Sequence, residues 1–170
     1  HLPYRNWCRH CVRAKGKAAD HSEHRRDDGL PEVHFDYCFL GSEGQEKHTV
    51  LVAKERNSKM TMSTIVPMKG ASEEWSVRRL LAFIKELGLE NADLVMKSDQ
   101  EPAIKSLRNE VTRRRTAASF PEEAMLHSSQ SNGFIERAVQ SVEGQIRVLK
   151  DALEARVGCA LTGPRAGEPV

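Results

Sequence analysis

The order in which strand-like and helix-like periodicities follow one another constrains the fold of this chain most. Residues 33–40 alternate aromatic side chains with others, which is the period-2 pattern of a strand. Two further strand-like runs, rich in Val, Thr, Ile and Met, cover residues 48–54 and 60–68. Short turns separate the three runs, so we predict an antiparallel meander.

Two helices and one more strand are expected after the meander. Apolar residues recur at helical spacing between Ser72, a predicted N-cap, and Gly88, a predicted stop. Residues 93–99 contain a short apolar run typical of a strand covered on both faces, and Pro102 suits the first turn of a helix. We therefore predict an α/β fold with a mixed central sheet, three antiparallel strands followed by α/β units, flanked by helices.

The rest of the chain is expected to be an irregular segment over residues 116–130 and a long final helix capped by Ser131 or Asn132. A tail over 157–170 lacks periodicity, and we expect it to be disordered. The face of the final helix predicted to point inward carries Ile135, Val139, Val142, Ile146, Leu149 and Leu153.

Composition suits one domain with an appendage. The chain has 170 residues, of which 39% are hydrophobic and 29% charged, and no apolar run is long enough to span a membrane. A net charge of +2 favours no partner by itself. The main domain is expected over residues 29–156, after a basic Cys/His segment over 1–28. Because the chain begins at His1 rather than Met, we expect a piece of a longer polypeptide.

Three acidic residues occupy positions that solubility does not explain. Asp36 lies in the middle of a predicted strand, Asp99 at the end of another and Glu136 early in the last helix. A buried carboxylate costs several kcal/mol unless it is paired or binds a metal. If the first and fourth strands are neighbours, the three acids can bind two Mg²⁺ or Mn²⁺ ions for phosphoryl transfer. The alternative for each acid, taken singly, is capping or a favourable helix-dipole position.

The short sequence motifs around these acids resemble those of a known family. A Ser-Asp motif lies within residues 97–103, and a Ser-Gln-Ser-Asn-Gly-x-x-Glu-Arg motif lies within 127–137. The chain has 62 residues between Asp36 and Asp99 and 36 between Asp99 and Glu136. In these features it resembles the integrases of retroviruses and LTR retrotransposons, which are ribonuclease-H-like polynucleotidyl transferases with an Asp, Asp, Glu triad.

This resemblance implies that Asp36, Asp99 and Glu136 are the catalytic residues and the ligands of two Mg²⁺ or Mn²⁺ ions. It implies 3′-end processing and strand transfer by the integrase catalytic core of a retrotransposon polyprotein. The implied partners are DNA, as element ends and as target, and further copies of the chain, with no membrane. The implied localisation is intracellular, and it is nuclear when the protein acts on chromosomal DNA. A transposase, a nuclease, or a degenerate or domesticated element that only binds nucleic acid stay open as alternatives.

Polar and basic residues near the acids are candidate DNA contacts. Asn132 and Gly133 are expected to form a hinge before Glu136, and Gln140 lies one turn after it on the same face. For the arginines named below the alternative is a solvated surface or, for Arg137, a pair with Glu143 within the helix, and for Gln130 it is a polar loop. The candidate nucleic-acid-binding residues are Gln130, Asn132, Arg137, Gln140, Arg113, Arg114 and Arg115.

The N-terminal segment contains a candidate zinc site. Cys8 and Cys11 have the spacing of two tetrahedral zinc ligands, and His21 and His24 are candidates for the other two. The gap between the pairs is shorter than in a zinc finger, so free cysteines and surface histidines stay open as the alternative. A close Cys pair without a disulfide framework favours a reducing, intracellular compartment.

Overall fold

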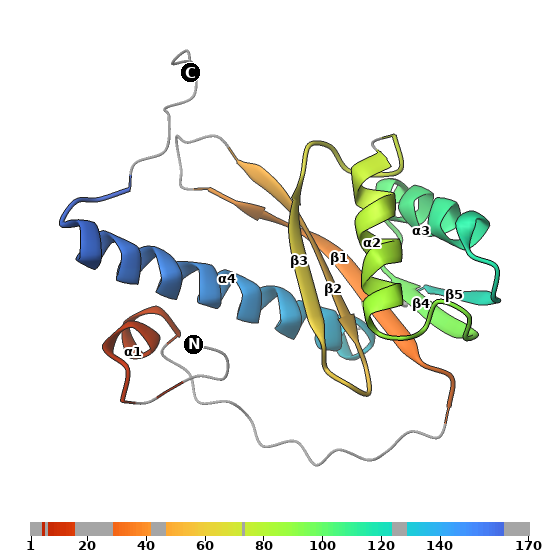
Figure 1. The fold of residues 1–170 in the computed structure, drawn as a ribbon, viewed down its shortest axis with the longest axis horizontal. Coiled ribbons are helices and arrows are strands. Elements are labelled where there is room, and N and C mark those ends of the chain that lie inside the picture. The colour runs from red at the N-terminus through yellow and green to blue at the C-terminus, as the bar shows by residue number, and fades with distance from the viewer. Residues whose placement is uncertain are drawn as a thin grey trace. The chain divides into compact units, whose positions relative to one another are not determined.

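The structure is a computed structural model that describes residues 5, 7–15, 29–41, 47–72, 74–123 and 129–161. The helices and strands follow one another as shown in Figure 1: α1 (Arg9–Lys15), β1 (Glu32–Leu40), β2 (His48–Glu55), β3 (Thr61–Val66), α2 (Glu74–Glu86), β4 (Leu94–Ser98), α3 (Pro102–Arg114), β5 (Ser119–Glu123) and α4 (Ser129–Val157).

The chain divides into two compact units. The first, called here the sheet unit, takes in Arg26–Leu40 and Lys47–Val139 and so contains all five strands. The second, called here the terminal unit, includes α1 and the part of α4 from Gln140 onward. None of the described helices is long and apolar enough to cross a membrane.

A five-stranded mixed sheet in the order β3-β2-β1-β4-β5 forms the centre of the sheet unit. The first three strands pair antiparallel, whereas β4 is parallel to both β1 and β5. Helices flank the sheet (Figure 1). The predicted α/β fold with a mixed sheet is confirmed, and the ribonuclease-H-like assignment stays a prediction.

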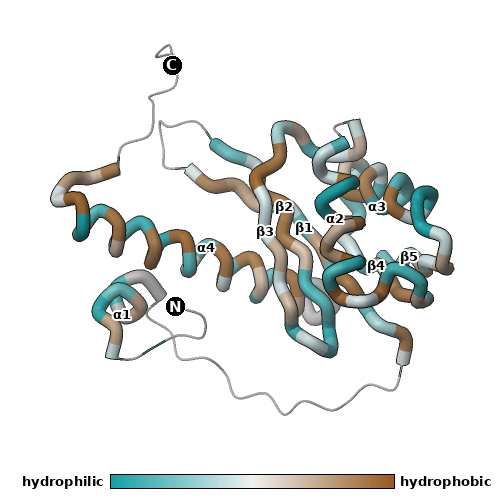
Figure 2. The backbone as a smooth tube through the Cα atoms, viewed as in Figure 1, coloured by the Kyte–Doolittle hydropathy of each residue, from teal (hydrophilic) through white to brown (hydrophobic). Residues whose placement is uncertain are grey.

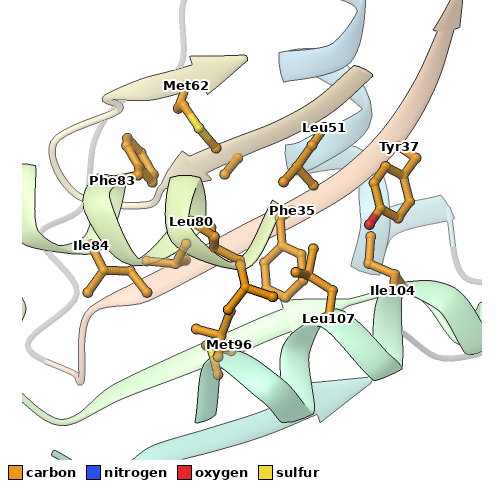
Figure 3. Packing of buried hydrophobic residues seen from close by; sticks show 14 of the residues in the cluster. Phe35, Tyr37, Leu51, Met62, Leu80, Phe83, Ile84, Met96, Ile104 and Leu107 are labelled. Carbon is orange, nitrogen blue, oxygen red and sulfur yellow. The ribbon is translucent and has the colours of Figure 1, made fainter. Parts of the chain in front are cut away.

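The core of the sheet unit lies between one face of the sheet and helices α2 and α3. Phe35 on β1, Met96 on β4 and Leu80 on α2 are all fully buried in it (Figure 3). Because side chains alternate along a strand, the neighbours of Phe35 in β1 point to the opposite face. On that opposite face His34, only 2% exposed, contacts Phe134 of α4 with their ring centroids 4.7 Å apart. Each face of β1 therefore has its own helical cover.

Strand β5 is absent from the sequence prediction, which made residues 116–130 irregular; that prediction is wrong for Ser119–Glu123. The strand is short, contains Pro121 and is mostly exposed, so it shows no apolar alternation. Ion pairs to neighbouring elements help to hold it, from Glu122 to Lys97 and from Glu123 to Lys105 and Arg108. Such long-range pairs leave no local signal in the sequence.

The final helix also differs from the prediction. Its helical backbone starts at Ser129, so Ser131 and Asn132 are not caps and Gly133 is not a hinge before the helix. Leu149 and Leu153, predicted to face inward, are 58% and 47% exposed. Alternating polar and apolar colours run along α4 in Figure 2, but the apolar stripe is not buried over its whole length.

The terminal unit explains part of that difference. There α4 contributes Val148, which is buried with Cys8 and Cys11, rather than the predicted leucines. His10 and Arg13 of α1 form ion pairs with Asp151. Helix α1 was not predicted, because its seven residues carry too few apolar side chains for a helical pattern. The predicted disorder of the tail falls largely on residues 162–170, which lie outside the described residues.

Two phenylalanines of β1 provide a matched test of this core. Phe35 is completely buried, whereas Phe39, on the same side of the strand, is 53% exposed. We expect Phe35→Ala to lower the free energy of unfolding by about 3–5 kcal/mol, because it leaves a cavity, and Phe39→Ala to lower it by less than about 1 kcal/mol. Urea unfolding followed by circular dichroism measures both; similar losses in the two variants would contradict the proposed core.

Candidate active site

The register between β1 and β4 places the first two predicted acids next to each other. The paired residues of these parallel strands end at His34 opposite Lys97. Two residues further along each chain stand Asp36 and Asp99, so the same register puts the two aspartates side by side at the carboxyl end of β4. The sequence prediction required these strands to be neighbours, and this is confirmed.

Asp36 is a partly buried carboxyl group in an acidic neighbourhood. Burial, and after it the charges of Asp99 and Glu101, raise its pKa from 3.8 to about 6. The Tyr37 backbone N–H, which donates to Asp36 Oδ1 at 2.7 Å, and the Lys69 ammonium act in the opposite direction. The charges of Asp99 and Glu101 therefore act on Asp36.

Two local features shape the acid neighbourhood. The Glu101 backbone N–H donates to Asp99 Oδ1 at 3.0 Å, which orients that carboxylate just before α3 begins. Lys69, in the loop between β3 and α2, donates to Glu101 Oε1 and Oε2 at 2.8 and 2.9 Å. Its ammonium also lies 5.4 Å from the ring centroid of Tyr37 and 4.8 Å from that of Phe39. A cation of the chain itself therefore neighbours the acids.

Sequence reasoning missed Lys69, because an isolated lysine in a loop looks like any solvated lysine. The only nearby signal is Gly70, which follows it. Gly70 has a φ of +94°, which favours glycine, and its N–H donates to the Tyr37 hydroxyl oxygen at 2.9 Å. This hydrogen bond ties the loop that carries Lys69 to β1.

Glu136, the third predicted acid, lies in the first part of α4 and is exposed, next to the buried Ile135. Among the described residues, no three side chains of His, Cys, Asp or Glu lie close enough together to bind one metal ion. The structure therefore brings Asp36 and Asp99 together without Glu136. Three carboxylates repel one another where no cation is bound, so the complete triad stays a prediction.

The predicted DNA contacts have varied surroundings. Arg113 and Arg114 pair with Glu110 at 2.7 Å, and Arg115 donates to the carbonyl oxygens of Leu89 and Ala92 at 3.0 and 2.6 Å. The last of these arginines thus connects α3 to the loop before β4. The role of all three in DNA binding stays a prediction.

The candidates on α4 are also untested as DNA contacts. Arg137 and Gln140 are exposed, Arg137 in the sheet unit and Gln140 in the terminal unit. Gln130 and Asn132 lie in the first turn of the helix, and their side chains are outside the described part of the structure.

The candidate zinc site is described only in part. Cys8 and Cys11 are 8% and 0% exposed and lie at the start of α1, whereas His21 and His24 fall outside the described residues. Cys38 is buried and Cys159 is exposed. Zinc binding stays a prediction.

Comparisons with known proteins give little more. No protein-family model and no curated protein matches the chain. One similar solved chain belongs to the cryoEM structure of the simian T-cell lymphotropic virus intasome in complex with PP2A regulatory subunit B56 gamma. The two chains are 13% identical with a TM-score of 0.45, and the match covers 85% of this chain and 63% of that one. This chain thus spans less than two thirds of the other, and so distant a likeness supports no functional assignment.

The raised pKa of Asp36 predicts a pH-dependent effect of its replacement. Because its pKa of about 6 in the folded state exceeds the ordinary value of 3.8, ionisation opposes folding; the penalty is absent below about pH 3.8 and full above about pH 6. In EDTA we expect Asp36→Asn to raise the free energy of unfolding by about 1–2 kcal/mol at about pH 8, and by much less at about pH 4.5.

Urea unfolding at the two pH values measures this difference. Glu90→Gln is the control, because Glu90 is an exposed carboxylate whose partner Lys85 lies 3.5 Å away at the surface. A gain in Asp36→Asn that was equal at both pH values would show that Asp36 ionises normally in the folded protein.

Proposed function

We propose that the chain is the catalytic core of a DNA integrase from a retrotransposon-type polyprotein, with a ribonuclease-H-like fold. The observation that supports this most is the parallel register of β1 and β4, which brings Asp36 and Asp99 together. These are the first two of the three acidic residues in the sequence motifs that resemble those of the integrase family. As proposed, the protein acts as a homo-oligomer on element ends and target DNA, in the nucleus.

The donor set suits hard divalent cations. Carboxylate oxygens are the ligands that Mg²⁺ and Mn²⁺ prefer, and the negative charges of Asp99 and Glu101 that act on Asp36 make a bound cation favourable. Asp36 and Asp99 would hold the metal, and Glu136 would complete the set from α4. When bound, two such ions activate the attacking oxygen and neutralise charge on the leaving oxygen.

The proposed reaction has two displacements at phosphorus. Water first breaks a phosphodiester bond near the element end and leaves a 3′-hydroxyl. That hydroxyl then loses its proton to solvent as its oxygen bonds to a target phosphorus, and the target P–O bond breaks to release a new 3′-hydroxyl. No covalent bond to the protein forms, so the side chains serve to position and to stabilise charge.

Replacement of the acids tests this chemistry directly. We expect Asp36→Asn, Asp99→Asn and Glu136→Gln each to abolish Mn²⁺-dependent strand transfer on oligonucleotide substrates, measured on gels, with the fold kept. Glu143→Gln is the matched control on α4, because Glu143 pairs with Arg147 at 3.9 Å, and it should retain activity. Full activity in any of the three acid variants would exclude that acid from the mechanism.

A second candidate is a nucleic-acid-binding module without catalysis. The exposed position of Glu136, apart from the aspartates, favours it. Metal binding distinguishes the two, since a ligand that binds only the folded state raises the melting temperature.

We expect Mn²⁺ at about 100 times its Kd to stabilise the wild-type protein by about 2.7 kcal/mol, seen as a rise in melting temperature. Asp36→Asn should show no such rise, and Glu90→Gln should show the wild-type rise. If Mn²⁺ leaves the wild-type melting temperature unchanged, the binding module is the better assignment.

A further inference from the structure

Two lysines converge on one aromatic ring at the start of α4. The Nζ atoms of Lys54, on β2, and Lys59, in the turn before β3, each lie 5.1 Å from the centroid of the Phe134 ring. The buried His34 contacts the same ring, tilted by 58°. All four residues belong to the sheet unit. We call Lys54, Lys59 and Phe134 the lysine cluster.

Among the described residues, neither lysine of the cluster has a carboxylate partner, whereas four other lysines of the sheet unit do. Lys69, Lys85, Lys97 and Lys105 each form an ion pair with a glutamate. Within the described part of the chain, no acidic side chain forms an ion pair with Lys54 or Lys59.

The carboxylates described near the cluster bind other partners. Burial, and next the charge of Lys59, lower the pKa of Lys54, so the two ammonium groups repel each other. The nearby Glu32 carboxylate already accepts from His34 at 3.0 Å and from Arg56 at 3.1 Å. Two neighbouring positive charges that no described carboxylate pairs with point to an anionic ligand.

The turn that carries Lys59 holds it in an unfavourable backbone conformation. Lys59 has a φ of 60°, in the left-handed region that glycine and asparagine tolerate better. The Glu55 carboxylate, 3% exposed, fixes this turn by accepting the backbone N–H groups of Asn57 and Ser58 at 2.8 and 2.5 Å. A lysine in this backbone conformation lowers the stability of the fold, and such strained residues are common at functional sites.

We infer that Lys54 and Lys59 together bind a backbone phosphate of DNA beside the acid site; that the ligand is DNA rests on the proposed function. Lys54 is paired with His34 across the sheet, and His34 precedes Asp36 by two residues on the same strand face. That separation is about 7 Å along the strand. A bound strand has a phosphate about every 3.4 Å along the helix axis, so one phosphate can meet the lysines while another meets the acids.

The salt dependence of DNA binding tests the lysine cluster. A fluorescent duplex is titrated in EDTA at several salt concentrations with the wild type, with the double variant Lys54→Gln/Lys59→Gln, and with the control Lys85→Gln/Lys105→Gln, which removes the same charge from α2 and α3. We expect the slope of log K against log salt to become shallower by about 0.9–1.8 only in the Lys54/Lys59 variant. Equal slopes in the two double variants would overturn the inference.

Two single variants separate binding from folding. Lys59→Asn should keep or raise the melting temperature, because asparagine tolerates the left-handed backbone, and should still weaken DNA binding. Lys54→Arg keeps the charge and should bind like the wild type. A Lys59→Asn protein that binds DNA as tightly as the wild type would also overturn the inference.

The outcome is independent of catalysis, because binding is measured in EDTA. If strand transfer is never observed but the Lys54/Lys59 variant alone loses salt-dependent affinity, the proposed integrase activity fails and the phosphate site stands. If strand transfer occurs and the slopes are equal, the activity stands and the phosphate site fails. A wild-type chain that binds no DNA overturns both.

Discussion

The parallel pairing of β1 with β4 is the constraint on which the candidate site depends. It sets two aspartates side by side, although like charges at close range repel and partial burial opposes their ionisation. The arrangement is tolerated because the alternate side chains of β1, such as Phe35, are fully buried in the core on the other face. Strand β1 thus carries both a buried core residue, Phe35, and an electrostatically unfavourable carboxylate, Asp36.

Most of the sheet unit could be predicted from the sequence, because its elements bury regular apolar patterns. The alternation in β1 and the helical spacing in α2 each specify one element within a few residues, and Pro102 marks the start of α3. The same patterns place Asp36 in one strand and Asp99 at the end of another, so the two aspartates are expected to be close once these strands are assumed to be neighbours.

What the sequence could not predict depends on contacts between distant residues. Strand β5 relies on ion pairs to β4 and α3, and Lys69 reaches the acids only through the fold. The exposure of Leu149 shows the opposite error, in which a regular pattern continues where no core covers it. Periodicity identifies a face that can be buried, but not the partner that buries it.

The placing of charge also explains why the net charge of +2 is uninformative. Most described lysines and arginines are neutralised by a neighbouring glutamate or aspartate, as in the pairs of Lys69 with Glu101 and Arg114 with Glu110. Functional electrostatics then lie in the few places where pairing is incomplete. Two such places are the acid neighbourhood of Asp36 and the lysines around Phe134.

The composition of β5 has a consequence for self-association. An outermost strand exposes unused hydrogen-bonding groups to which a second molecule can add its own strand. Here Pro121 removes one N–H donor from this outermost strand. This strand therefore resists intermolecular sheet growth, which helps to keep the protein from aggregating at high concentration.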